Sequence, residues 1–380
     1  MDIVIIGGGI VGSAVAYFLA RTGRAGSIAV IEPDPSYEFS ATPAANGGIR
    51  QLFSLPENIR MAQFGLNFFA NFHETMGLDI GFQRRGYLFI SDDGDHKQME
   101  INHRLQESMG ARVDLLDGAA LGDRFPSVNV ADVALATHSP DDAWINPHAA
   151  LMEFRNKARS LGVDYIKDRV VGWRADGGVA RDVVLGSGET LTADSFVLAA
   201  GAWSGEIGAM IGMALPVEPM CRESHYFVTT NEIEPLPFIK TETHIAFGPE
   251  GAGYAGGLPD WDQPAGFHLD PHPTRFEDEV WPMIAHRVPP LETLKLQRTW
   301  TGHYARNTLD LNAIVGRWDG GAENVFMACG YSGHGIMHAP ASALALTELM
   351  LDGGYSTLDI SAFGYDRIAA GKPYREQGIV

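Results

Sequence analysis

Three glycines near the start of the chain have the spacing of a turn that binds a dinucleotide. Gly7, Gly9 and Gly12 form the pattern G-x-G-x-x-G directly after the apolar run 3–6. The first glycine permits a tight bend, the second lets the backbone approach a pyrophosphate, and the third lets the next helix pack closely. Glu32 lies twenty positions after Gly12, where a carboxylate accepts hydrogen bonds from ribose hydroxyls. These residues predict a nucleotide site; the alternative is an ordinary glycine-rich turn.

The loop 33–51 is the second candidate segment, and it is rich in Pro, Ser, Ala and Gly. A loop directly after the ribose-binding acid is expected to wrap a cofactor. Its residues 46–48 (Asn-Gly-Gly) can bring backbone close to a flat ring. Arg50 would place a fixed positive charge beside that ring, or it is a surface arginine.

A third segment follows the predicted strand 196–200. This apolar run ends in Gly201-Ala202-Trp203. Parallel strands end at the same edge of a sheet, so we expect Gly201 near Gly7. Trp203 either covers the ligand ring or packs in the core.

A second strand, glycine-rich turn and helix occur late in the chain. The turn is 330–335 and the helix is predicted over 336–351. The N-terminus of a helix carries partial positive charge. Such a helix N-terminus suits a ring whose edge becomes anionic, as the N1–C2=O edge of an isoalloxazine does on reduction.

The elements that position these residues follow from hydrophobic periodicity and turn residues. Between 215 and 304, strand-like runs carrying His, Tyr and Arg predict an antiparallel sheet with one face toward a site. Neither metal-ligand spacing nor a G-x-S-x-G motif occurs, so no metal site and no nucleophilic triad are predicted. Helices are predicted over 13–22, 58–76, 97–109, 147–161 and 336–351, and strands over 3–6, 28–31, 86–91, 196–200 and 324–329.

Composition narrows the class of protein. A chain of 380 residues, 45% hydrophobic and 20% charged, predicts a globular protein of two domains, or of one domain with a large insertion. The formal charge of −19 argues against nucleic acid or an anionic membrane surface as a partner. Two cysteines, Cys221 and Cys329, imply no disulfide framework. Without an apolar run long enough to span a bilayer or room for a signal peptide before the first strand, a cytoplasmic location is expected.

Taken together, these motifs resemble the D-amino acid oxidase/sarcosine oxidase/glycine oxidase family of FAD enzymes. The segments that show the resemblance are GGGIVG with Glu32, VLAAGAWS (197–204) and W-x-G-x-Y…IVG…ACGYSGHGI (300–336). Within the family, Ser40, 46–51 and 54–59 are most similar to the branch of the mitochondrial FAD-dependent oxidoreductase domain proteins.

The resemblance implies an α/β fold with a Rossmann-like FAD domain that is discontinuous in sequence. That domain would comprise 1–80, 140–215 and 305–380, and a substrate domain with a mixed, mainly antiparallel sheet would comprise 81–139 and 216–304. The implied reaction is hydride transfer from a C–N bond of an amino acid or secondary amine to flavin N5, which gives an imine that hydrolyses. The implied cofactor-binding residues are Gly7, Gly9, Ile10, Val11, Gly12, Glu32, Ser40, Ala45, Asn46, Gly47, Gly48, Val170, Gly201, Trp203, Gly330, Ser332, Gly333, His334, Gly335 and Ile336.

Departures from the family pattern concern the flavin linkage and the substrate. Members with covalent FAD have a cysteine in the stretch that reads RTWTGHY here, or a histidine where this chain has Asn46, so noncovalent FAD is expected. Met337 replaces a carboxylate-binding lysine, and Tyr304 replaces an arginine. The lysine that promotes reaction with oxygen is not recognised, which leaves oxygen or another electron acceptor open. The residues expected to orient the substrate are Arg50, Arg222, His303, Tyr304 and Arg306.

Three alternatives remain at this point. One is a hydroxy-acid or polyol-phosphate oxidoreductase on the same fold, because fold does not fix the substrate. The second is a flavin-containing assembly or scaffold protein, and the third is an NAD enzyme. The sequence does not indicate the oligomeric state.

Overall fold

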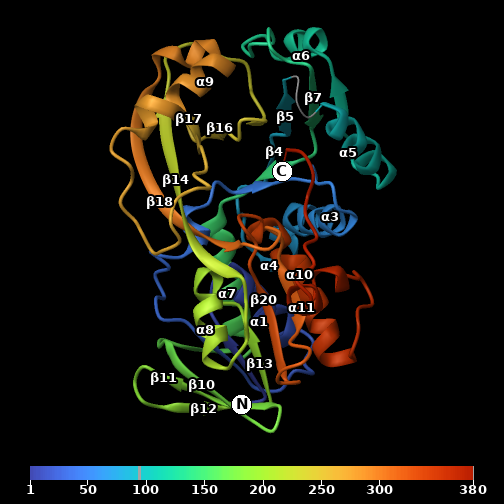
Figure 1. The fold of residues 1–380 in the computed structure, drawn as a ribbon, viewed down its shortest axis with the longest axis vertical. Coiled ribbons are helices and arrows are strands. Elements are labelled where there is room, and N and C mark those ends of the chain that lie inside the picture. Colours follow the sequence, from blue (N-terminus) through green and yellow to red (C-terminus); the bar gives the residue numbers. More distant parts are fainter. Residues whose placement is uncertain (93–95, 380) are drawn as a thin grey trace.

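Two sheets, one in each half of the molecule, organise the chain in the computed structural model, which describes residues 1–92 and 96–379. In Figure 1, sheet A occupies the lower half with the N-terminus, and sheet C occupies the upper half. The C-terminus lies where the two halves meet (Figure 1). This arrangement confirms the predicted α/β fold with a second sheet.

Sheet A has the strand order β19-β20-β13-β1-β2-β9 and is parallel except for its edge strand β19. Its central strands are short, buried apolar runs, as the sequence predicts for strands covered on both faces. The strands are β1 (Ile3–Ile6), β2 (Ile28–Ile31), β9 (Asp164–Ile166), β13 (Ser195–Leu198), β19 (Ile314–Arg317) and β20 (Val325–Cys329).

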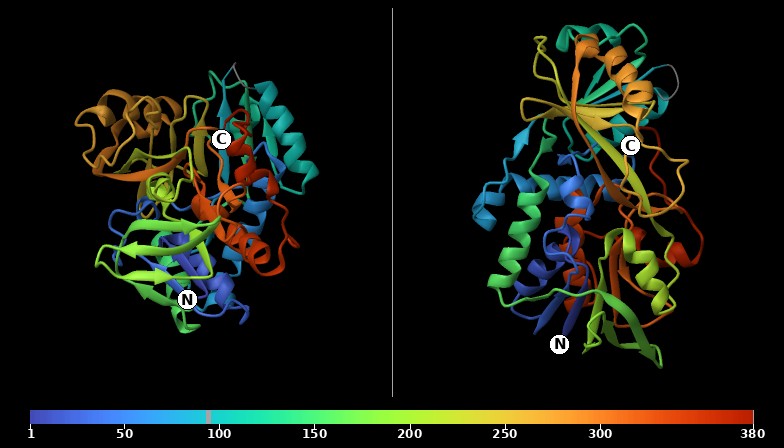
Figure 2. Two further views of the ribbon diagram at one scale, coloured as in Figure 1. Left: turned by 60° about the horizontal axis from the view of Figure 1, so that its bottom comes forward. Right: turned by 90° about the vertical axis from the view of Figure 1, so that its left-hand side faces the viewer.

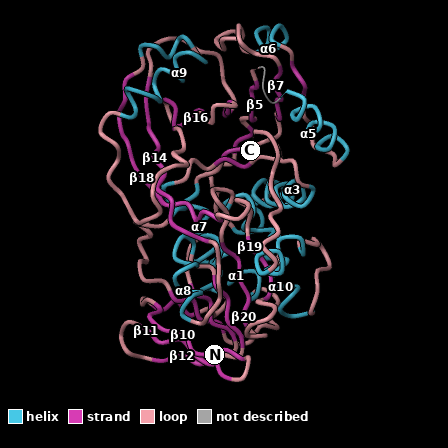
Figure 3. Tube along the Cα trace, viewed as in Figure 1, coloured by secondary structure: helices cyan, strands magenta, loops and turns pink. Residues whose placement is uncertain are grey.

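Helices enclose sheet A, and Figure 3 shows them around its strands. The helix α1 (Ile10–Ala20) packs against α10 (Gly335–Asp352) and α7 (Pro147–Ser160). The predicted helix 58–76 is in fact two, α3 (Pro56–Ala70) and α4 (Phe72–Met76), because Asn71 leaves the helical conformation. The remaining helices are α2 (Ala41–Ala44), α5 (His96–Ser108), α6 (Gly118–Arg124), α8 (Ser204–Met210), α9 (Trp281–Arg287) and α11 (Tyr365–Ala369).

Sheet C has the order β18-β14-β17-β16-β15-β5-β7-β6 and is antiparallel except for the β15–β5 pair. This confirms the expected mixed, mainly antiparallel sheet. Its outer side packs against α9, and its long strands β14 and β18 extend toward the lower half (Figure 2). The strands are β5 (Tyr87–Ser91), β6 (Asp114–Leu116), β7 (Leu135–Ser139), β14 (Val217–Val228), β15 (Phe238–Thr241), β16 (Ala246–Glu250), β17 (Gly253–Gly257) and β18 (Lys295–Asn307).

Two small sheets complete the fold. A hairpin sheet is formed by β10 (Val170–Asp176), β11 (Val179–Leu185) and β12 (Thr190–Thr192). The other pairs β8 (Ala143–Trp144) with β3 (Gly48–Ile49) and β4 (Gln83–Arg84), so it joins the loop after β2 to the chain that enters sheet C.

The C-terminal segment 370–379 carried no sequence signal, but it is tied into the fold. Asn58 Nδ2 donates to the carboxylate of Glu376 (2.6 Å), and Asn312 Nδ2 donates to the carbonyl oxygen of Tyr374 (2.6 Å). Within the part of the chain that the structure describes, no helix has the length and apolar character to cross a bilayer.

Candidate functional site

The turn from β1 into α1 is shaped by its glycines. Gly7 has φ +103°, and a Cβ there would lie 2.4 Å from the carbonyl oxygen of Ala199. A Cβ on Gly12 would lie 1.9 Å from the carbonyl oxygen of Gly7. A Cβ on Gly9 would have no heavy atom of another part of the chain within 4 Å, and α1 begins after Gly9 without a side-chain cap. The turn therefore leaves open space in front of free helix N–H groups, which suits a pyrophosphate.

Glu32 closes the other side of this turn. Its carboxylate accepts from the backbone N–H of Gly8 (2.9 Å) and of Asp34 (2.9 Å). Burial raises the pKa of Glu32, and these hydrogen bonds oppose the shift. Val170, four residues after β9, lies at the same end of sheet A, because β9 runs parallel to β2. The geometry fits the ribose and base of a nucleotide.

The loop around α2 crosses between the two halves. Trp300 Nε1 donates to the carbonyl oxygen of Ala44 (2.9 Å), which pins the loop to β18. Gly47 has φ +75°, and a Cβ there would lie 2.1 Å from the carbonyl oxygen of Ile145. Two polar atoms of the loop, Ser40 Oγ and Asn46 Oδ1, are buried without a partner. Buried polar atoms are rarely left unpaired, so these two point to a polar ligand.

The glycine-rich turn 330–335 brings the N-terminus of α10 close to β18. Gly330, Ser332 and Gly333 all have positive φ, and a Cβ on Gly333 would lie 2.7 Å from the ring of Tyr304. Ser332 is used structurally, because its Oγ accepts from the backbone N–H of Asn307. His334 precedes the first turn of α10, whose N-terminus has no side-chain cap. The turn thus faces β18 and offers free N–H groups to a ligand.

Arg50 lies between this helix end and sheet C. It donates from Nη2 to His334 Nε2 (3.0 Å) and from Nη1 to the carbonyl oxygen of Leu52 (2.6 Å). Its guanidinium carbon lies 4.0 Å from the ring centre of Phe53 and 5.4 Å from that of Phe89. Burial lowers its pKa even though Tyr87 and other acidic groups nearby oppose the shift. Arg50 is 5% exposed, which excludes the surface-arginine alternative.

Sheet C contributes three further side chains, Arg222, Lys240 and Tyr304. We call these three, together with Arg50 and His334, the basic chamber. Arg222 lies on β14 with its guanidinium carbon 5.4 Å from the ring centre of Tyr304. Its Nη1 is buried without a partner. Lys240 lies on β15, where Arg50 and Arg222 are the charges that act on it. Among the described residues, none of these three cations forms an ion pair with a carboxylate.

Three predicted residues lie elsewhere. His303 faces the opposite side of β18 from Tyr304, and its Nε2 contacts the carbonyl oxygen of His268 (2.9 Å). Arg306 donates to the carbonyl oxygen of Trp261 and pairs with Glu218 (3.8 Å). Trp203 stacks on Phe267, with ring centres 4.6 Å apart. Because side chains alternate along a strand, His303 points away from the chamber. The contacts of Arg306 with Trp261 and Glu218 hold its side chain outside the chamber.

Lys240 was missed by the sequence analysis, which named no site residue in the strand 238–241. The signal was available: in FIKT, a lysine alternates with apolar residues on a short strand. Asp142 was missed too, and it is fully buried, accepting from the backbone and side-chain N–H groups of Gln51. Burial raises the pKa of Asp142 to about 7.

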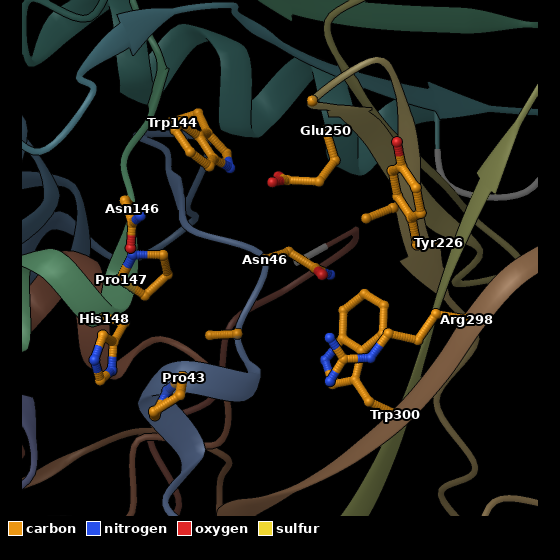
Figure 4. A pocket seen from close by; sticks show the side chains of 13 residues that line it. Pro43, Asn46, Trp144, Asn146, Pro147, His148, Tyr226, Glu250, Arg298 and Trp300 are labelled. Carbon is orange, nitrogen blue, oxygen red and sulfur yellow. The ribbon is translucent and has the colours of Figure 1, made fainter. Parts of the chain in front are cut away.

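A cavity of about 430 Å³ opens beside the loop 43–46. Figure 4 shows Asn46 pointing into it, with Trp144, Asn146 and His148 on one side and Glu250, Tyr226, Arg298 and Trp300 of sheet C on the other. Ala255 of β17 also lines it, so the cavity reaches the chamber-facing side of sheet C. Its size suits a small-molecule ligand. No group of His, Cys, Asp and Glu that could hold a metal ion occurs among the described residues.

Comparison with known proteins agrees with this geometry. A family model described as FAD dependent oxidoreductase matches residues 2–349. FAD-dependent oxidoreductase domain-containing protein 1 of Xenopus laevis is 34% identical, over 100% of this chain and 85% of that protein. L-proline dehydrogenase from P. horikoshii has a TM-score of 0.87 at 28% identity, over 98% of this chain and 99% of that chain. Glycine oxidase from Geobacillus kaustophilus has a TM-score of 0.83 at 20% identity, over 96% of this chain and 97% of that chain, and shows the shared fold.

Proposed function

The chain belongs to the FAD-dependent oxidoreductase family, and we propose that it oxidises the C–N bond of an amino acid or secondary amine. The observation that supports this most directly is the basic chamber, which lies between the N-terminus of α10 and sheet C. Bound FAD supplies a ring that accepts a hydride, and the protein supplies orientation and charge.

The described residues fit FAD. Gly9 and the N-terminus of α1 would hold the pyrophosphate, and Glu32 the ribose. Ser40 Oγ and Asn46 Oδ1 are unpaired and would gain partners. The N-terminus of α10 would face the ring edge that becomes negative on reduction.

We further propose that FAD is bound noncovalently. Where β18 meets the loop, the residues are Gly302 and Ala44, and a Cβ on Gly302 would lie 2.6 Å from that of Ala44. A longer, reactive side chain at position 302 would therefore displace the loop. Acid precipitation should release the flavin into the supernatant.

Arg222 would bind a carboxylate of the substrate. The unpaired Nη1 of Arg222 is buried, and a buried cation without an acceptor is costly. A carboxylate would satisfy it, with the Tyr304 ring beside it. L-proline dehydrogenase, a structural relative, is named for oxidation of a secondary amine that carries a carboxylate. The cavity beside Asn46 leaves room for substrates larger than proline.

Anaerobic mixing of the FAD-loaded protein with a panel of substrates tests this proposal. The panel contains L-proline, sarcosine, N-alkyl glycines and D-amino acids, with lactate and glycerol 3-phosphate as alcohol controls. We expect at least one amine, and no alcohol, to bleach the flavin. Bleaching by an alcohol alone would indicate a hydroxy-acid enzyme. No bleaching, together with a co-purifying protein, would indicate a scaffold role.

A further inference from the structure

Lys240 faces the cofactor half of the molecule. On β15 it pairs with Phe89 of β5, whose ring contacts Arg50. The residue before Lys240, Ile239, packs into the core on the outer side of sheet C. Because successive side chains of a strand point to opposite faces, Lys240 points toward Arg50 and the end of α10.

On the β16 and β17 side of Lys240, the neighbouring residues are small. Its partner across β16 is Ala246, and Ala246 in turn pairs with Gly257 of β17. A Cβ on Gly257 would lie 2.7 Å from the carbonyl oxygen of Glu223, so a larger residue does not fit there. The Lys240 side chain is only partly buried although it lies between the two halves. Lys240 is therefore not enclosed by large side chains on this side, which leaves it accessible from the cofactor half.

The titratable groups that act directly on Lys240 are basic. They are Arg50, Arg222 and His334. Beyond them, Tyr87, Tyr304, Asp142, Glu376 and His338 act on Arg50. Burial, together with the charges of Arg50 and Arg222, lowers the pKa of Lys240 well below its usual value. Lys240 has neither a hydrogen bond nor an ion pair within the described part of the chain.

The two histidines are poorly placed to accept a proton. His334 Nε2 already accepts from Arg50, and an arginine can only donate, so the remaining ring nitrogen carries the proton. His338 is 1% exposed, and burial and Arg50 lower its pKa to about 3. Lys240, by contrast, is partly exposed, and burial and the nearby charges of Arg50 and Arg222 lower its pKa toward that of a proton acceptor.

We propose that Lys240 is the proton acceptor coupled to reduction of the bound flavin, and that it takes the proton which the substrate ammonium must lose. The second half of this inference rests on the proposed amine oxidation. The lysine amine and the substrate ammonium exchange one proton, which leaves a lysine ammonium and a neutral amine. The amine then loses a hydride, with both electrons, to the flavin and becomes an iminium ion that water hydrolyses. The new charge on Lys240 offsets the negative charge that reduction adds.

The first experiment needs no substrate. The midpoint potential of FAD in the loaded protein is measured against pH by spectroelectrochemistry, for wild type, Lys240→Met and Lys240→Arg. We expect two protons per two electrons in wild type and one in both variants, because arginine keeps the charge but cannot accept a proton. Lys295→Met, at the exposed end of β18, is the control. Two protons in all four proteins would overturn the proposal.

The second experiment follows anaerobic reduction by sarcosine or L-proline against pH. In Lys240→Met and Lys240→Arg the rate should fall about tenfold per pH unit below the pKa of the free amine, which is near 10 for an aliphatic amine. The loss at pH 7 would then approach about 1,000-fold, with recovery at high pH. A pH profile equal to that of wild type would contradict the role toward substrate. If neither amine reduces wild type, the amine oxidation proposal fails for these substrates, and the potential measurement still decides whether Lys240 takes up a proton.

Discussion

The turns that would hold the nucleotide and the part of sheet C that lines the chamber are built in different ways. On the side of sheet A, the contacts come from backbone: Gly7 and Gly12 approach carbonyl oxygens that leave no room for a Cβ. On the side of sheet C, the chemistry comes from side chains on regular strands, Arg222, Lys240 and Tyr304. A backbone site tolerates almost no substitution, whereas a side-chain site can change its chemistry without changing the fold. The nucleotide half is therefore expected to be the part shared among relatives, and the sheet C half the part that sets the substrate.

The largest effect should follow Gly12→Ala. The new Cβ would lie 1.9 Å from the Gly7 carbonyl oxygen. Because that oxygen belongs to the backbone and cannot rotate away, α1 must move away from β1. Overpacking should outweigh the better helix propensity of alanine and cost about 3 kcal/mol or more. Urea denaturation of the cofactor-free protein measures this. Wild-type stability in the variant would show that the helix and strand adjust freely, against the rigidity argued for this half.

An intermediate effect is expected for Asp142→Asn. The folded state raises the pKa of this carboxyl to about 7 from an unfolded value of 3.8. Between these values the folded protein keeps a proton that the unfolded chain has lost, so wild-type stability falls as pH rises through this window. Relative to wild type, the variant should gain roughly 2 kcal/mol between pH 5 and pH 7, at up to about 1.4 kcal/mol per pH unit.

Urea denaturation of the cofactor-free proteins at both pH values measures the gain of Asp142→Asn. Asp141→Asn is the matched control, because Asp141 pairs with Arg112 at the surface, where its side chain is 38% exposed. A gain that does not change with pH would show that Asp142 is ionised in the folded protein throughout this range.

The smallest effect on stability should follow Gly9→Ala. Gly9 has φ −62°, which alanine adopts, and no atom lies within 4 Å of the new Cβ. Stability of the cofactor-free protein should stay within about 0.5 kcal/mol, while the dissociation constant for FAD rises at least about tenfold, because the methyl group occupies the space of the pyrophosphate. Equilibrium titration with FAD measures the second effect. Unchanged affinity would place the pyrophosphate elsewhere.

Sequence patterns determined the backbone half of the site. Glycine spacing, buried apolar strands and the acid at Glu32 are local in the chain, so they can be read from short windows. The turn at 330–335 and the strand ends near Gly201 were predicted for the same reason. The break at Asn71 was not predicted, because the apolar spacing continues across it.

Only the tertiary structure decided which side chains meet in the chamber. His303 and Tyr304 are neighbours in sequence and equally able to bind a substrate, yet strand alternation sends them to opposite faces of sheet C. Lys240 and Arg50 are 190 residues apart, and they approach one another because β15 pairs with β5, whose Phe89 contacts Arg50. Local patterns fix turns and strands, whereas the pairing of distant strands fixes which charges share a desolvated space.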